Sequence, residues 1–261
     1  MFLTKSVVLS LFFALLLSGC GGSDDFGVGN GGSNSSETTD DGADDTGDTG
    51  DTGDTGDNTT IGSVTLVVLD SDLIMTADGA ETTVARVTIT NTEDDPLSGL
   101  EVTFTAELGT LGSASATTNS SGIAEVILTS PLVLGSGSVS VSDDESGITS
   151  DAVSLTFVAG PPANVAFQSS PSTLSLSGSA TLLATVTDAN SLPVNANNLT
   201  FSISTDQSGA SLSALTSATD ANGQASITYT AGTTAGTDTL GVRASNGQTG
   251  SLEITVTAGS V

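Results

Sequence analysis

One segment of this chain occurs twice, and the repetition constrains the fold more than any other feature. Residues 89–104 read ITNTEDDPLSGLEVTF, and 97 residues later residues 186–201 read VTDANSLPVNANNLTF. In both copies an alternating run ends in an apolar residue, a polar turn and a proline follow, and a second alternating run ends in Phe. The identical pairs are Thr90/Thr187, Pro96/Pro193, Thr103/Thr200 and Phe104/Phe201. A shared spacing marks one structural unit used twice, so the sequence predicts two modules of about 100 residues each.

Short runs of alternating apolar and polar residues surround both copies and predict an all-β fold. No segment beyond the N-terminal apolar run has a convincing helical period. A turn of the first module contains Gly122, its counterpart contains Gly223, and we expect both glycines to have a positive φ. The strands expected in the first module are residues 64–69, 73–76, 83–90, 100–107, 114–118, 123–129, 137–142 and 152–158.

Alternation also predicts which side chains face the two cores. In the first module these are Ala85, Val87, Ile89, Leu100, Val102, Phe104, Ala124, Val126, Leu128, Val139, Val141, Val153, Leu155 and Phe157. In the second they are Leu182, Ala184, Val186, Leu199, Phe201, Ile203, Ala225, Ile227, Tyr229, Leu240, Val242, Leu252, Ile254 and Val256. The spacing between the copies changes from 97 to 101 and then to 99 residues, and each change falls between strands. Length changes confined to loops are typical of β-sandwiches, so we expect two tandem Ig-like sandwiches.

The residue types available to the chain exclude several functions. Its 261 residues include 30 acidic residues, three basic residues (Lys5, Arg86 and Arg243), no His, and a single cysteine, Cys20. A disulfide framework and a Cys/His metal site are therefore excluded. No His can activate a Ser or Thr nucleophile, so we expect no catalytic residue and no enzyme activity. The negative charge repels nucleic acid and anionic lipid head groups, which excludes both as direct partners.

The first twenty residues have the three-part pattern of a secretory signal. Lys5 precedes an apolar run at residues 7–17, and this run is too short for the roughly 20 residues of a transmembrane helix. The ending Leu17-Ser18-Gly19-Cys20 resembles the bacterial lipobox. The resemblance implies cleavage after residue 19 and lipidation of Cys20, with an ordinary cleaved signal as the alternative. Gly21 rather than Asp follows the cysteine, and in this the chain resembles Gram-negative lipoproteins that are released to the outer membrane.

Residues 20–60 form an acidic segment rich in Gly, Ser, Thr and Asp, with a repeated Asp-Thr-Gly triplet. Such a composition cannot bury enough apolar surface to offset chain entropy, so we expect a disordered spacer. The alternative is calcium binding, because an Asp recurs at every third position at Asp45, Asp48, Asp51, Asp54 and Asp57. This spacing matches neither the EF-hand loop nor the nonapeptide calcium repeat.

Four segments resemble the group 1 bacterial immunoglobulin-like domains of the invasin and intimin family. They are VTDANSLPV and TDANGQASITYTAG in the second module, and ITNTEDDPL and TNSSGIAEVILTS in the first. The resemblance covers about residues 62–159 and 161–258, and we expect domains at 61–160 and 161–261. It implies tandem surface-exposed domains that extend an adhesin from an outer membrane. Receptor contacts in that family lie mostly in a terminal tip, so no receptor-binding residue is carried over.

The best candidate site is a group of carboxylates in two loops of the first module. In an Ig-like sandwich these loops share one end, which would bring together Glu93, Asp94, Asp95, Asp143, Asp144 and Glu145. Carboxylate oxygens are the ligands that Ca²⁺ prefers, so one hypothesis is a calcium site. The other is a solvated acidic tip that keeps the domain soluble. We expect no other cofactor.

These features predict a lipid-anchored outer-membrane lipoprotein, exposed at the cell surface, with a structural or adhesive role. Its membrane contact would be the lipid on Cys20, and its partner would be an unidentified component of the envelope or of a host surface. The alternative is a periplasm-facing module for glycan- or calcium-dependent binding or scaffolding.

Overall fold

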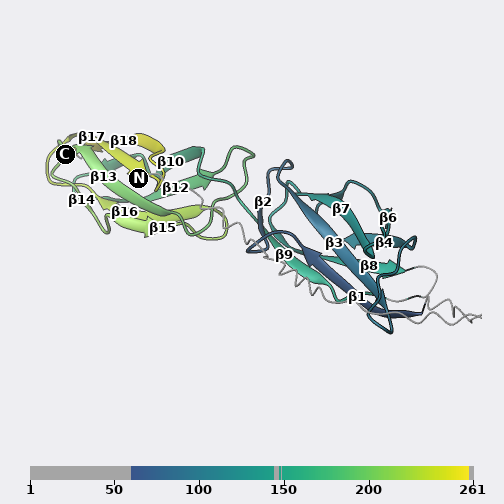
Figure 1. Ribbon diagram of the computed structural model, residues 1–261. Coiled ribbons are helices and arrows are strands. Elements are labelled where there is room, and N and C mark those ends of the chain that lie inside the picture. Colours follow the sequence, from purple (N-terminus) through teal and green to yellow (C-terminus); the bar gives the residue numbers. More distant parts are fainter. Residues whose placement is uncertain (1–59, 144–146, 148, 259–261) are drawn as a thin grey trace, which may run out of the picture. The chain divides into compact units, whose positions relative to one another are not determined.

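The computed structural model describes residues 60–143, 147 and 149–258, and every regular element in these ranges is a β-strand (Figure 1). The predicted signal, Cys20 and nearly all of the predicted spacer lie outside the described residues. Within the described ranges, no helix has the length and apolar character needed to cross a membrane. The strands form four sheets, which pack as two sandwiches with separate hydrophobic cores. The predicted all-β fold with two Ig-like sandwiches is confirmed.

The first sandwich consists of nine strands in a four-stranded and a five-stranded sheet. The sheet orders are β1-β3-β7-β5 and β2-β9-β8-β4-β6. The strands are β1 (Ile61–Val68), β2 (Ile74–Thr76), β3 (Thr82–Asn91), β4 (Glu101–Ala106), β5 (Thr110–Leu111), β6 (Ser115–Thr117), β7 (Ile123–Thr129), β8 (Gly135–Asp143) and β9 (Val153–Val158).

The second sandwich repeats this arrangement strand for strand. Its sheet orders are β10-β12-β16-β14 and β11-β18-β17-β13-β15. The strands are β10 (Asn164–Ser170), β11 (Thr173–Ser175), β12 (Ser179–Thr187), β13 (Asn198–Thr205), β14 (Ser211–Leu212), β15 (Thr216–Ala218), β16 (Gln224–Thr230), β17 (Gly236–Arg243) and β18 (Thr249–Thr257). In each sandwich one short strand, β2 or β11, pairs in parallel with the last strand.

The two cores contain the side chains that alternation placed inside. All predicted inward residues are buried except Leu100, Val153, Ile203 and Leu252, which are half-buried. Each core also buries residues that lie outside the predicted set, such as Met75 of β2 and Ala231, which follows β16. Burying a large aliphatic or aromatic side chain contributes roughly 1.5–3 kcal/mol, so these cores can hold each sandwich together without disulfides.

The duplicated segment forms the same turn in both sandwiches. After β3, Thr90 bridges to Pro96, and after β12, Thr187 bridges to Pro193. The glycines predicted to have a positive φ do so, at 69° for Gly122 and 71° for Gly223. A side chain on Gly122 would lie 2.4 Å from the carbonyl oxygen of Ile89, so this turn needs glycine for space as well as for φ.

Candidate functional site

The acidic turn of the first sandwich is built on Asn91, the last residue of β3. The Asn91 Oδ1 accepts hydrogen bonds from the amides of Glu93 and Asp95, both at 2.9 Å. Asp94 has a positive φ of 68°, a conformation that Asp tolerates better than most residues. The carboxylates of Glu93, Asp94 and Asp95 are all exposed on this turn. Three of the candidate ligands therefore lie next to one another in sequence on one turn.

The other predicted calcium ligands are only partly described. Asp143 ends β8 opposite Val102 of β4 and is buried, with 4% of its surface exposed. Asp144 and Glu145 lie outside the described residues. Within the described ranges, no group of three or more Asp, Glu, His or Cys is arranged to hold a metal ion. The calcium site remains a prediction based on the sequence.

In the second sandwich, Asp188 occupies the position that Asn91 has in the first. Its Oδ1 accepts from the amides of Asn190 and Leu192, each at 2.9 Å, which repeats the turn of the first sandwich. Its Oδ2 accepts from the amide of Gly160, also at 2.9 Å. Asp188 is 1% exposed, so this carboxylate is fully used in fixing the turn and the segment that precedes β10. Its role is structural rather than catalytic.

A buried polar network lies at the start of β17 and was not predicted from the sequence. The Asp238 Oδ1 accepts from the amides of Gln207 and Ser208, at 2.6 and 3.0 Å. The Oδ2 accepts from the Ser208 hydroxyl at 2.5 Å and from the Tyr229 hydroxyl. Asp238 and Tyr229 are both fully buried, so no substrate can reach them. The network ties the loop after β13 to β16 and β17.

The protonation states of this network follow from burial and hydrogen bonding. Burial raises the pKa of Asp238, but the hydrogen bonds donated by Ser208, Tyr229 and the two amides outweigh it, so the pKa lies below its usual value. Burial, and then the hydrogen bond to Asp238, raises the pKa of Tyr229 to about 12. At neutral pH the carboxylate is therefore ionised and the phenol is protonated. Alternation could have placed Asp238 inward, because it lies two residues before the buried Leu240.

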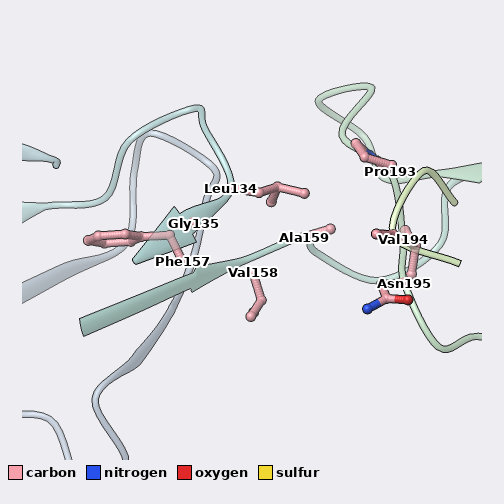
Figure 2. A pocket seen from close by; sticks show the side chains of 9 residues that line it. Leu134, Gly135, Phe157, Val158, Ala159, Pro193, Val194 and Asn195 are labelled. Atoms are coloured by element: carbon pink, nitrogen blue, oxygen red, sulfur yellow. The ribbon is translucent and has the colours of Figure 1, made fainter. Parts of the chain in front are cut away.

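An apolar hollow of about 460 Å³ lies beside the ends of β8 and β9 (Figure 2). It is lined by Leu134, Gly135, Phe157, Val158, Ala159, Pro193, Val194, Asn195 and Ala221. Ligand sites combine an apolar wall with a few convergent polar groups that fix orientation. Asn195 alone among these residues has a polar side chain, so the hollow is a poor candidate for a specific small-molecule site.

Comparisons with known proteins agree with the fold and with the predicted resemblance. Residues 66–158 match the family "Bacterial Ig-like domain (group 1)". Among solved structures, InvD from Yersinia pseudotuberculosis is 25% identical, with a TM-score of 0.54, and the match covers 75% of this chain and 58% of InvD. The Escherichia coli adhesin FdeC is 22% identical, with a TM-score of 0.51, and the match covers 75% of this chain and 64% of FdeC. The Yersinia pseudotuberculosis adhesin InvE is 23% identical, with coverages of 78% and 62% and a TM-score of 0.43.

The matched region thus spans about six-tenths of each of these structures. Among curated proteins, no sequence matches this chain. The two sandwiches have the Ig-like fold that is also present in InvD and FdeC, and the family match applies to the first of them.

Proposed function

We propose that this chain is a lipid-anchored outer-membrane protein that displays two Ig-like domains at the cell surface, with a structural or adhesive role and no catalysis. The observation that carries this proposal is the tandem of two Ig-like sandwiches, whose fold is similar to that of InvD and of the Escherichia coli adhesin FdeC. In this proposal residues 1–19 are a cleaved signal, residues 20–60 are the lipidated spacer, and residues 61–160 and 161–261 are the displayed domains.

The connection between the sandwiches supports a display role. Only five residues, 159–163, separate β9 from β10. The amide of Gly160 donates to Asp188, and the amide of Ala163 donates to the carbonyl of Thr187 at 2.9 Å. The side-chain amide of Asn246 donates to the carbonyl of Pro162 at 2.7 Å. Pro161 and Pro162 also restrict the backbone, so the connection is short and tied down rather than slack.

The sequence around Cys20 supports the anchor. A lipobox-like ending closes an apolar run of signal type, and the chain contains no second cysteine that could compete. Each buried CH₂ of an attached acyl chain contributes about 0.8 kcal/mol, so several chains on one residue hold a protein stably at a membrane. The acidic, Gly-rich spacer would keep the domains away from the anionic bilayer surface.

Protease added to intact cells tests the display. We expect loss of the signal from an antibody against the second sandwich, while a periplasmic marker in the same cells stays intact. Cys20→Ser tests the anchor separately, because the variant should leave the membrane fraction and appear in the soluble fraction. Protection of the second sandwich in intact cells, with digestion after the outer membrane is permeabilised, would overturn surface display.

A second candidate function is a periplasm-facing module for glycan- or calcium-dependent binding or scaffolding. The acidic turn at residues 93–95 favours it, because three consecutive acidic residues are exposed on this turn. The same protease experiment separates the two candidates, because only the periplasm-facing protein is protected in intact cells.

A further inference from the structure

Four apolar side chains lie on part of the outer face of the four-stranded sheet in the first sandwich, beside the ion pair of Arg86 and Glu125. Leu69, which directly follows β1, donates its amide to the carbonyl of Val84 in β3, and Val84 pairs with Ile127 in β7, so these three residues form one row across the sheet. Val67 lies on the same face, two residues before Leu69. Leu69 is 49% exposed, Ile127 is 54% exposed and Val67 is 41% exposed. We call Val67, Leu69, Val84 and Ile127 the apolar face.

The second sandwich shows that the fold does not require these apolar side chains. The strand registers align the apolar face with four polar residues, Gln168, Ser170, Thr181 and Thr228. The second sandwich has one aliphatic residue near the centre of this face, the half-buried Leu183, where the first sandwich has Arg86. One chain therefore contains the same sheet surface in an apolar and a polar version. Packing within the sandwich does not account for the difference.

The charge around the apolar face argues against a second copy of the chain as its occupant. Residues 61–160 contain 14 acidic residues and one base, Arg86, which already pairs with Glu125 at 2.5 Å. Asp70 directly follows Leu69, the amide of Asp72 donates to the Asp70 Oδ1 at 3.4 Å, and the Glu81 carboxylate accepts from the amide of Thr76 in β2. Burial, and then the neighbouring Asp72 and Glu81, raise the pKa of Asp70, so the two neighbouring carboxylates repel that of Asp70. Two copies of this acidic surface would repel each other. A positively charged group beside Asp70 would instead relieve the repulsion between the carboxylates.

We propose that the apolar face is a docking site for a basic, amphipathic protein segment. Its aliphatic side chains would cover Leu69, Val84 and Ile127, and its Lys or Arg side chains would face Asp70, Asp72 and Glu81. The apolar row supplies the contact area, and the carboxylates supply orientation and faster association. This inference goes beyond display at the cell surface and does not depend on which side of the membrane the domains occupy.

The test measures peptide binding to the full chain in solution. The probe is a synthetic peptide of alternating Leu and Lys, and a peptide of alternating Leu and Glu is its control. The variant Val67→Gln, Leu69→Ser, Val84→Thr, Ile127→Thr gives the first sandwich the residues of the second and keeps every charge, including those of the acidic spacer. The matched control Ile74→Thr, Val158→Thr removes two exposed apolar residues from the other sheet, where the second sandwich has Thr173 and Thr257.

We expect the Leu/Lys peptide to bind the parent chain and the matched control equally, and the four-site variant at least tenfold more weakly. A second variant, Asp70→Asn, Asp72→Asn, Glu81→Gln, leaves the apolar row intact and should also weaken binding, by an amount that shrinks as salt increases. Equal binding by the parent and the four-site variant would overturn the proposal, as would equal binding of the Leu/Glu peptide. A dimer in sedimentation that the four-site variant abolishes would assign the face to a second copy and overturn it as well.

Discussion

Asp238→Asn is expected to lower the pKa of Tyr229 and to destabilise the second sandwich. In the folded chain the pKa of Tyr229 is about 12, against about 10 for a free tyrosine. Burial is the largest cause, and the hydrogen bond to the Asp238 carboxylate is the second. The Asn variant keeps the burial and removes the charge. The pKa of Tyr229 should therefore fall from about 12 but stay above that of a free tyrosine.

The cost in stability follows from the four hydrogen bonds that the Asp238 carboxylate accepts. Asn has one acceptor oxygen where Asp has two, so two of the four donors lose their acceptor and the other two donate to a neutral group. A hydrogen bond to a charged group contributes roughly 1.5–3 kcal/mol and one between neutral groups roughly 0.5–1.5 kcal/mol. The neutral amide avoids part of the desolvation cost of the carboxylate, so the net loss should be about 2–4 kcal/mol at neutral pH. Because the pKa of Asp238 is lowered on folding, its stabilisation is present above about pH 4 and is lost as the pH falls further.

The assay is favourable because Tyr229 is the single Tyr of the chain and there is no Trp. Tyrosinate absorbance during an alkaline titration reports this residue alone, and urea denaturation gives the loss of stability. Because folding raises the pKa of Tyr229, the contribution of its protonated form to the free energy of unfolding is fully present below about pH 10 and is lost as the pH rises toward 12. Glu253→Gln, which neutralises an exposed carboxylate on β18, is the control and should leave both quantities unchanged. Titration of Tyr229 near pH 10 in the folded parent chain would refute the buried network.

Three further predictions concern the turns. Gly223→Ala should lower the free energy of unfolding by about 1–3 kcal/mol, measured by urea denaturation, because its φ is 71° and a side chain would lie 2.4 Å from the carbonyl oxygen of Val186. Asp188→Ala should cost about 3 kcal/mol or more and speed hydrogen exchange at the amide of Gly160, whereas Asp188→Asn, which copies the first sandwich, should cost less. Calcium should raise the melting temperature of the parent chain if the carboxylates at 93–95 bind it, and an unchanged value within error would reject the calcium site.

Much of the fold was predictable because side chains along a strand alternate between the two faces of the sheet, and a sandwich buries one of these faces. Ala85, Val87 and Ile89 alternate without interruption, and β3 contains all three on its buried face. The turn that contains Gly122 was predictable because few residues other than glycine adopt its φ. The two-residue strands β5 and β14 were not predictable, because two residues are too short to show alternation.

The candidate site was less predictable because it depends on contacts between distant residues. The turn at 93–95 was correctly placed at a loop, but the role of Asn91 as its hydrogen-bond acceptor depends on the folded geometry of the turn. The Asp238 network was missed because three of its four hydrogen bonds come from Gln207 and Ser208, about 30 positions earlier in the sequence. When the donors are not known, a carboxylate at an inward position contradicts the expectation that charged side chains face the solvent.

The corresponding place in the first sandwich explains why the described residues there do not form this network. The registers align Asp238 with Gly137 and Tyr229 with Leu128. A side chain on Gly137 would lie 2.8 Å from the Cβ of Leu108, so the first sandwich fills this place with leucine and leaves no room for a carboxylate. The polar network of the second sandwich requires three things at once: the Asp238 carboxylate, the groups that donate to it, and no leucine at the position of Leu108. An exchange of Asp238 alone between the copies would therefore leave a buried, unsatisfied charge, so this end of the sandwich can change only as a unit.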